Sequence, residues 1–386
     1  MSNYFSDYNK KNCNGCGVCA LKCPKNAIIM EKDSEGFLYP IIDKKKCIDC
    51  KLCMKICPNK EYAKNENVNT YIAINKDKNQ LKSSSSGGCF LPIARYIISK
   101  NGVVFGVKYD EQLNVVHDFA ECFEELKKFQ GSKYVRSDLN NSYIQVEKFL
   151  LENRYVLFSG TPCQCQGLRT YLGSDYDKLY TCEIICHANS SPDIFNLYKS
   201  NLEIESNKKI TDIKFRSKSN GWKNQKTLIY YNDGTTEEDI SFYMGFVNEL
   251  FNRPSCHNCN FCTSSRLSDF TIGDAWGINE FDPDIEDDDT GISLFCINTK
   301  KGIELIKILE KDLFLKKTDT EKAFEYNHNK NVKENKKRNE FFEKVANDKI
   351  NKTNIIKNIK KYTKTSLPKK CFNKIRYVFN KIKSSR

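Results

Sequence analysis

Short apolar segments separated by polar turns run along most of the chain, and their periodicity predicts both strands and helices. Apolar or alternating runs predict strands at 27–30, 37–42, 102–107, 155–158 and 292–297. Apolar residues at helical spacing predict helices at 90–100 and 302–309, and a further helix that ends at Leu172. Strands that alternate with helices in this way predict an α+β protein whose body is a mixed α/β domain with a partly parallel sheet.

From Asn331 onward the periodicity stays helical but few large apolar clusters remain, so we expect a helical tail. Residues 331–386 contain 18 Lys and Arg against 4 Asp and Glu, whereas the whole chain carries a net charge of +13. After Pro368, apolar residues recur at helical spacing among basic ones, at Phe372, Ile375, Phe379 and Ile382. Such a helix suits peripheral contact with an anionic membrane or an acidic partner, although a plain solvated helix has the same composition. Since no nucleic-acid-binding module accompanies the charge, we expect no nucleic-acid partner.

The length of 386 residues and the hydrophobic content of 39% fit two or three globular domains. We expect an N-terminal domain at 1–62, a body at 70–315 and the basic tail at 316–386, with a polar linker at 59–69. No run of about 18 apolar residues predicts a membrane-spanning helix, and the first residues contain no apolar signal segment. The sequence therefore predicts a cytoplasmic protein.

Cysteine is the most informative residue type, because 19 are present and eight of them lie between positions 13 and 57. An odd number in a reducing compartment indicates metal or redox chemistry instead of disulfides. Two segments, Cys13–Pro24 and Cys47–Pro58, both read C-x2-C-x2-C-x3-C-P. In a two-cluster ferredoxin, each such run gives three ligands to one 4Fe-4S cluster and its fourth cysteine to the other. The predicted sets are Cys13, Cys16, Cys19 and Cys57 for one cluster, and Cys47, Cys50, Cys53 and Cys23 for the second.

Zinc is the alternative for these two segments, but zinc sites usually combine two C-x2-C pairs, or cysteine with histidine. A third C-x2 step followed by C-P is typical of 4Fe-4S ligation. This part of the chain resembles a bacterial-type two-cluster ferredoxin domain over nearly its whole length. We therefore expect a ferredoxin or another redox protein as a partner.

A second group of cysteines lies in the predicted body, and its ligand set stays open at this point. Cys256, Cys259 and Cys262 repeat the C-x2-C-x2-C step, so they fit three corners of a third 4Fe-4S cluster with Cys163 or Cys186 as the fourth. Alternatively, Cys256 and Cys259 ligate the cluster together with both remote cysteines. A zinc site that uses His257 or His187, or a group of buried thiols, would also explain the pattern.

The segment Ser83–Gly88 reads SSSSGG directly before a predicted helix, and small residues there allow a phosphate to approach free backbone N–H groups. A plain loop is the alternative. No G-x-G-x-x-G follows a predicted strand and no P-loop signature is present, so the sequence does not favour a Rossmann-type nicotinamide site or a nucleoside-triphosphate hydrolase.

Several motifs in order resemble the coenzyme F420 hydrogenase/dehydrogenase beta-subunit family over roughly residues 10–315. The motifs are Gly131–Leu139 (GSKYVRSDL), Ser159–Arg169 (SGTPCQCQGLR), Phe215–Trp222 (FRSKSNGW) and Arg253–Ile278 (RPSCHNCNFCTSSRLSDFTIGDAWGI), with Ser83–Gly88 in the matching place. The resemblance implies a flavoprotein oxidoreductase with FAD beside iron–sulfur clusters. Its FAD passes two electrons to a deazaflavin coenzyme or another small-molecule acceptor, while the clusters carry single electrons.

The resemblance also implies particular site residues. The expected flavin contacts are Ser85, Ser86, Gly87, Gly88, Gly131, Ser132, Lys133 and Tyr134, and the expected ligands of a third cluster are Cys163, Cys186, Cys256 and Cys259. Asp274 is expected near the same site, with capping of the turn at 275–278 as its structural alternative. For Lys133 the alternative is a solvated surface lysine. Cys262 departs from the family pattern, and a non-catalytic electron-transfer subunit is the alternative function.

Overall fold

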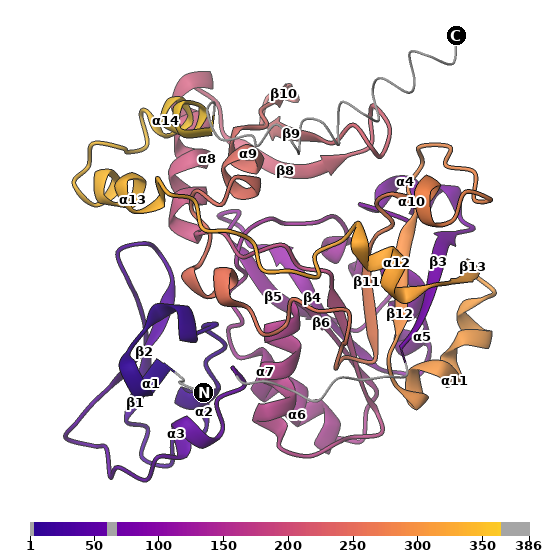
Figure 1. Ribbon diagram of the computed structural model, residues 1–386, viewed down its shortest axis with the longest axis horizontal. Coiled ribbons are helices and arrows are strands. Elements are labelled where there is room, and N and C mark those ends of the chain that lie inside the picture. The colour runs from indigo at the N-terminus through magenta and orange to yellow at the C-terminus, as the bar shows by residue number, and fades with distance from the viewer. Residues whose placement is uncertain (1–3, 60–67, 364–386) are drawn as a thin grey trace.

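A computed structural model describes residues 4–59 and 68–363 (Figure 1). An N-terminal module of short helices and one hairpin lies against a larger body that is built on an eight-stranded sheet. The predicted mixed α/β architecture with a ferredoxin-like N-terminal region and C-terminal helices is confirmed. Most of the predicted linker and the amphipathic helix expected after Pro368 lie outside the described residues.

The N-terminal module has very little core of its own. Its elements are α1 (Tyr4–Asp7), η1 (Lys10–Asn12), α2 (Val18–Leu21), β1 (Ile28–Lys32), β2 (Leu38–Ile42) and α3 (Leu52–Lys55). The strands β1 and β2 form the predicted hairpin, and the Asp33 carboxylate caps its turn by accepting from the backbone N–H of Glu35 and Phe37. One small cluster, Tyr4, Phe37 and Tyr39, is its separate apolar core. So small a core makes the module depend on cofactors and on the body for stability.

The sheet of the body has the strand order β13-β3-β12-β11-β7-β6-β4-β5, with a parallel centre, since β4, β6, β7 and β11 run in one direction. The strands are β3 (Asn69–Asn75), β4 (Val103–Tyr109), β5 (Val115–Ala120), β6 (Val156–Gly160), β7 (Leu179–Ile184), β11 (Phe270–Asp274), β12 (Ser293–Ile297) and β13 (Leu313–Thr318). The three later strands predicted from the sequence, now β4, β6 and β12, are confirmed. Ligands of open sheets bind where parallel strands end, so the carboxyl ends of β6, β7 and β11 are the place to look for a site.

Helices cover both faces of this sheet (Figure 1). On one face, α5 (Phe90–Ser99) and α11 (Lys300–Leu309) pack on Val104 and Leu157. On the other, α6 (Ser142–Leu151) and α7 (Pro162–Leu172) pack on Val103, Phe105 and Phe158. Alternate residues of a strand point to opposite faces, so continuous apolar runs such as Val103–Phe105 are what a doubly covered sheet requires. The predicted helices at 90–100 and 302–309 and the one ending at Leu172 are confirmed.

A second apolar core lies above the sheet and includes the last two described helices of the basic tail. It contains α8 (Pro192–Ser206), β8 (Ile210–Ser217), β9 (Lys226–Tyr231), β10 (Thr236–Glu238), α9 (Ser241–Val247), α13 (Arg338–Ala346) and α14 (Ile355–Thr363). Phe341, Ile355 and Ile359 of the two C-terminal helices are completely buried against α8 and α9. The shorter elements are α4 (Lys78–Ser83), η2 (Glu124–Phe129), η3 (Pro254–Asn258), α10 (Ile278–Phe281) and α12 (Thr320–Glu325).

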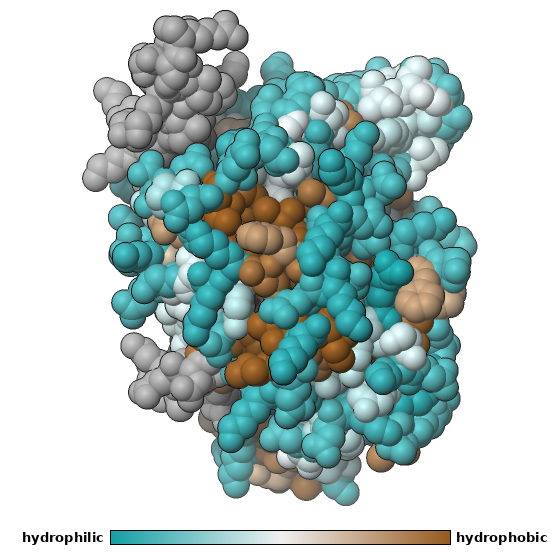
Figure 2. Space-filling view, turned by 90° about the vertical axis from the view of Figure 1, so that its right-hand side faces the viewer, coloured by the Kyte–Doolittle hydropathy of each residue, from teal (hydrophilic) through white to brown (hydrophobic). Residues whose placement is uncertain are grey.

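The face of the body opposite the N-terminal module carries an apolar patch in its centre (Figure 2). Ile303 and Ile308 of α11 and Phe314 of the edge strand β13 are each more than a third exposed there. Among the described residues, none of the helices has the length and apolar character needed to cross a membrane.

Candidate metal centres and adjoining cavity

The first predicted cysteine set surrounds one small buried space. Cys13, Cys16, Cys19 and Cys57 all line it. The loop that carries the first three bends through Gly15, whose φ of +66° suits glycine, and a Cβ there would lie 2.9 Å from the Arg253 guanidinium. Burial raises the pKa of the Cys16 thiol to about 12. A buried thiolate at this position therefore needs positive charge beside it, as an iron–sulfur cluster supplies.

The second predicted set lies farther out in the N-terminal module. Cys47 and Cys50 are exposed, and both are close enough to Cys53 to raise the pKa of its thiol, although burial has the larger effect. Cys23 follows α2, which packs against the α3 helix that carries Cys53. The repeat thus produces one set whose four thiols are all partly buried and one set in which two of the four thiols are exposed.

The third predicted set is assembled from three separate parts of the body. Cys163 opens α7 after β6, Cys186 follows β7, and Cys256 and Cys259 lie on and after η3. These four line one small space together with Cys262. Burial raises the pKa of Cys186 well above its usual value, and the neighbouring Cys256, Cys163, Cys259 and Cys262 raise it further.

Cys262 and Cys165, each within three residues of a predicted ligand of the third set, have different surroundings. The Cys262 thiol donates to the backbone oxygen of His328 at 3.6 Å while it lines the same space. Cys165, by contrast, is buried in the core between α6, α7 and the sheet, with its Sγ 3.9 Å from the backbone oxygen of Cys182. The structure therefore brings Cys262 to the third set as a fifth thiol and leaves Cys165 in the apolar core.

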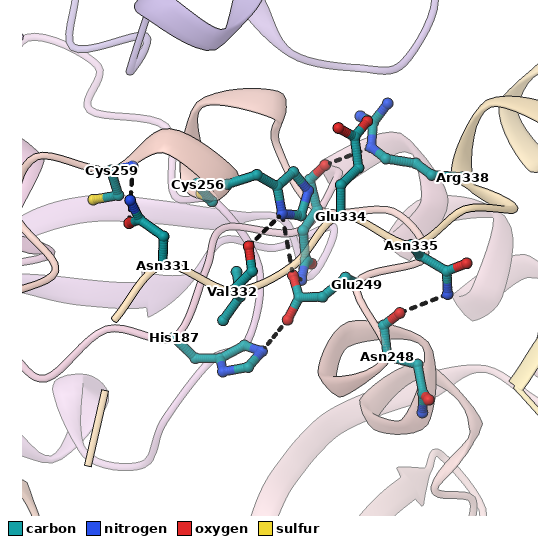
Figure 3. Close-up of polar contacts among 12 residues, drawn as sticks. His187, Asn248, Glu249, Cys256, Cys259, Asn331, Val332, Glu334, Asn335 and Arg338 are labelled. Carbon is teal, nitrogen blue, oxygen red and sulfur yellow. Dashed lines mark hydrogen bonds and ion pairs between the residues drawn. The ribbon is translucent and has the colours of Figure 1, made fainter. Parts of the chain in front are cut away.

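Both histidines considered as zinc ligands have other partners (Figure 3). His187 pairs through Nε2 with Glu249, and its Nδ1 lies 3.1 Å from Nε2 of His328. His257 Nδ1 lies 3.3 Å from the backbone oxygen of Val332. These contacts disfavour the zinc interpretation of the third set.

Two buried arginines connect the cysteine sets, and the sequence analysis missed both. Arg136 donates through Nη1 to Cys163 Sγ at 3.5 Å and through Nη2 to the backbone oxygen of Gly15 at 3.1 Å. Arg253 donates through Nε to the backbone oxygen of Cys13 at 2.9 Å, with Nη2 3.7 Å from Cys13 Sγ. Positive charge and N–H donors beside thiolates are the features that tune iron–sulfur sites.

A signal for one of these arginines was present in the sequence. Arg136 lies in the Gly131–Leu139 motif, and Arg253 comes three residues before Cys256. A basic side chain three residues from a predicted cluster ligand is a signal that could have identified Arg253, whereas Arg136 has no predicted ligand nearby in the sequence.

A cavity of about 330 Å³ opens beside the third set, where β6, β7 and β11 end. Most of the residues predicted from the family resemblance line it, namely Ser85, Ser86, Gly88, Gly131, Ser132, Lys133, Tyr134 and Asp274. Gly87 lies behind this lining: its N–H donates to Ser293 Oγ at 2.8 Å, and a Cβ would collide with the backbone of Ala73. Cys186 and His187 line both this cavity and the space between the third-set cysteines.

One wall of the cavity is a rigid loop of small residues. The Ser85 hydroxyl accepts from the Ser132 N–H at 2.8 Å, which joins the two predicted segments, and Lys218 donates to the backbone oxygen of Ser86 at 2.6 Å. The α5 helix begins at Phe90 directly after the loop, and its first turn also lines the cavity. Free N–H groups at a helix start, with hydroxyls around them, suit a phosphate.

Lys133 lies in the same wall and is half-buried, so the interpretation as a solvated surface lysine is wrong. Its Nζ donates to the backbone oxygens of Gln130 and Gly131, both at 3.2 Å. Burial lowers the pKa of Lys133 to about 8, although the nearby Asp212 carboxylate acts in the opposite direction. A bound anion would favour the charged form of this lysine and raise its pKa again.

Asp274 and Arg216 form a polar corner at another wall. Asp274 Oδ2 accepts from Arg216 Nη1 at 2.6 Å, and α10 is instead preceded by Gly277, so the capping interpretation of Asp274 is wrong. Arg216 Nε and Nη2, Asp274 Oδ1 and Gln225 Oε1 are buried without a hydrogen-bond partner among the described residues. All three side chains line the cavity. Buried donors and acceptors without partners are costly, which indicates a polar ligand here.

Models of known protein families match two parts of the chain. Residues 153–323 match the family model for the C terminus of the coenzyme F420 hydrogenase/dehydrogenase beta subunit, and residues 12–60 match that of a 4Fe-4S dicluster domain. A chain from the F420-reducing NiFe hydrogenase complex of Methanosarcina barkeri has 18% identity and a TM-score of 0.44, over 78% of this chain and 93% of that one.

No protein with a curated description matches the chain in sequence. The two family models cover the motifs on which the resemblance was based, apart from Gly131–Leu139 and the loop before α5. The chain is therefore an iron–sulfur electron-transfer protein that is related, over residues 153–323, to the C terminus of coenzyme F420 hydrogenase/dehydrogenase beta subunits.

Proposed function

We propose that the chain is an iron–sulfur flavoenzyme that exchanges electrons between three 4Fe-4S clusters and an FAD in the 330 Å³ cavity. The FAD, when bound, exchanges two electrons with an acceptor such as coenzyme F420 or an organic substrate. The observation that carries the proposal is the shared wall of Cys186 and His187, which lies between the third cysteine set and the cavity. If a cofactor occupied each of the two spaces, little more than this wall would separate the two cofactors.

The order of the cysteine sets supports a single route. Cys16 of the first set is close enough to Cys163 of the third for a thiolate at Cys163 to raise the pKa of Cys16, and Arg136 contacts both loops. The second set lies at the outer side of the module, where Cys47 and Cys50 are exposed. The sets thus form a series from the protein surface to the cavity.

Different residues of the cavity would hold different parts of FAD. The Ser85–Ser132 contact, the first turn of α5 and Lys133 present hydroxyls, N–H groups and a positive charge, which suit the pyrophosphate. Arg216 and Asp274 present unpaired donors beside an unpaired acceptor. A free phosphate would meet repulsion from Asp274, whereas a flavin ring edge with adjacent C=O and N–H groups satisfies both residues.

Cofactor analysis after anaerobic purification tests this proposal. Three clusters predict about twelve irons per chain, with one FAD released on denaturation. Iron without flavin, after reconstitution with FAD, would contradict the flavoenzyme and favour an electron-transfer subunit that docks to a partner enzyme. That alternative is compatible with the dicluster-domain match alone.

A pair of variants on α7 tests the third cluster. Cys163→Ser removes a cysteine that lines the third-set space, so we expect loss of about four irons per chain. Cys165→Ser is the matched control because Cys165 lies two residues away in the apolar core. Equal iron content in both variants would contradict a cluster held by Cys163.

A further inference from the structure

The outer end of the N-terminal module is an exposed loop around two predicted cluster ligands. Every residue from Asp43 to Lys51 is exposed, including Cys47 and Cys50. Asp49 and Lys51 adopt positive φ angles of 53° and 59°, which is uncommon outside glycine and gives this loop a defined turn. A cluster held here would be reached from solvent directly, unlike one in the buried first set.

Charge on this loop is strongly positive. Residues 43–55 contain Lys44, Lys45, Lys46, Lys51 and Lys55 against only Asp43 and Asp49. The two aspartates pair with Lys46 at 3.7 Å and Lys51 at 3.1 Å, but all four side chains are exposed. Exposed pairs of this kind neutralise charge locally and contribute little stability, so the loop remains basic overall.

Apolar side chains lie among the lysines. Ile48 is 59% exposed between the two cysteines, and Ile29 and Ile41, which face each other across the hairpin, are 55% and 44% exposed. The Cys47 N–H donates to the Asp43 backbone oxygen at 3.0 Å, which holds the cysteine loop close to the end of β2. An apolar centre with a charged rim is the usual composition of a transient protein interface.

This face points away from the body, whereas the other side of the module is occupied (Figure 1). Arg253 fills the inner side by donating to the backbone oxygens of Cys13 and Leu38. Arg338 holds the turn of the hairpin through two bonds to the Glu35 carboxylate, at 2.9 and 2.5 Å. The inner side is therefore closed to a partner protein, and the outer loop is the accessible route to the cysteine series.

We infer that the outer-loop surface, made of Ile41, Lys44, Lys45, Lys46, Ile48 and Lys51, docks a small acidic protein that carries single electrons. The inference rests on the proposed function, because it requires a cluster at the second cysteine set. In each encounter one electron passes from the reduced centre of the carrier to that cluster. The carrier is oxidised by one electron, the cluster is reduced by one, and no bond or proton changes place. Two encounters supply the two electrons that the acceptor takes.

Electrostatics sets the expected kinetics. A basic surface raises the association rate of an acidic partner, and salt screens this attraction over about 10 Å at 0.1 M. Carrier-dependent reduction should therefore slow as ionic strength rises. Reduction by a basic carrier of similar potential should be slower at low salt, since like charges oppose encounter.

The test uses the full chain, reconstituted anaerobically, and a reduced acidic two-cluster ferredoxin as the probe. The variant Lys44→Glu/Lys45→Glu/Lys46→Glu should lower the association rate at least tenfold at low salt and weaken binding measured by titration calorimetry. Its matched control, Lys300→Glu/Lys307→Glu/Lys311→Glu, changes three exposed lysines on or beside α11 by the same charge. We expect less than a twofold change in that control, because α11 lies on the far side of the body (Figure 1).

Two further measurements separate the possible failures. Iron content and the number of electrons taken up from dithionite at equilibrium should equal those of the wild type in both variants, which shows that the clusters are intact. If the two triple variants slow reduction equally, or if a basic carrier reacts faster than the acidic one, the docking surface is wrong and the proposed function stands. If the wild type contains no second cluster, or binds no flavin, the proposed function itself fails.

Discussion

The two cysteine sets of the N-terminal module share one sequence pattern but lie in opposite surroundings. The inner set, Cys13, Cys16, Cys19 and Cys57, borders the body, and the Arg253 guanidinium lies against its loop. The outer set includes Cys47 and Cys50, which are exposed in a basic loop. If both sets hold clusters as we propose, the internal repeat provides one centre suited to transfer within the protein and one suited to transfer between proteins. The difference comes from what packs on each loop and not from the ligands.

The sharpest way to break this comparison is to remove one ligand from each set. Cys16→Ser and Cys50→Ser should each lose about four irons and slow electron transfer from ferredoxin to FAD more than a hundredfold, since serine replaces a soft thiolate. Only Cys16→Ser should also loosen the module, because Cys16 packs against Gly167 of α7. Iron analysis and limited proteolysis between the module and the body measure the two effects.

The result that would contradict the comparison is equal loosening in both variants. Metal binding and folding are coupled in small modules, so the outer cluster could also stabilise its own loop. Proteolysis within residues 43–51 would then increase in Cys50→Ser while the inner contacts stay protected. This pattern would sharpen the comparison instead of breaking it.

A smaller effect is expected from Arg136, which links the inner set to the third. Arg136→Gln removes a positive charge and an N–H donor at Cys163 Sγ. Since positive charge favours the more negative, reduced form of a cluster, the midpoint potential of the third cluster should fall. We expect transfer from the inner to the third cluster to slow about tenfold, with partial rescue by Arg136→Lys. Redox titration followed by EPR measures the potential.

Arg338→Gln is the matched control for Arg136. Arg338 is equally buried and also contacts the N-terminal module, through Glu35, but its bonds go to a carboxylate and to the backbone oxygen of Asn252. Breaking this pair should reduce stability by about 3 kcal/mol, because a partly buried charge loses its partner. The cluster potentials should not change. If Arg338→Gln shifted the potential of the third cluster as much as Arg136→Gln does, both shifts would report only altered docking of the N-terminal module.

Local pattern predicted much of this fold and the cysteine chemistry. The C-x2-C-x2-C-x3-C-P runs predicted the 4Fe-4S dicluster domain, and apolar periodicity located α5, β4, β6 and α11, because both signals lie within a short stretch of chain. The ligands of the third set could not be assigned from the sequence, because no single short stretch of chain contains them. Its cysteines come from the ends of β6 and β7 and from η3, and only the sheet order brings these together.

The same limit explains the polar contacts that were missed. Arg216 meets Asp274 from β8, 58 positions away, and Arg253 meets Cys13 from 240 positions away. Such pairs depend on the packing of whole layers, so no local pattern predicts them. One alternative made Asp274 a cap of the turn at 275–278, because an Asp before a turn often caps it. In the structure, the Asp274 carboxylate pairs instead with a buried guanidinium.

The smallest expected effect concerns Lys133 in the cavity wall. We expect the affinity for FAD to depend on pH through the charge of this side chain. Because burial lowers the pKa of Lys133 to about 8, the side chain is mostly charged at pH 7 and mostly neutral at pH 9. If its charge faces the pyrophosphate, the Kd for FAD should rise about threefold over this interval. The Lys133→Met variant should bind FAD more weakly at pH 7, and its Kd should no longer depend on pH. The Lys44→Glu/Lys45→Glu/Lys46→Glu variant should keep the pH dependence of the wild type. Flavin fluorescence titrations at fixed ionic strength provide the measurement. A pH dependence that persists in Lys133→Met would assign it to another group and remove Lys133 from the cofactor site.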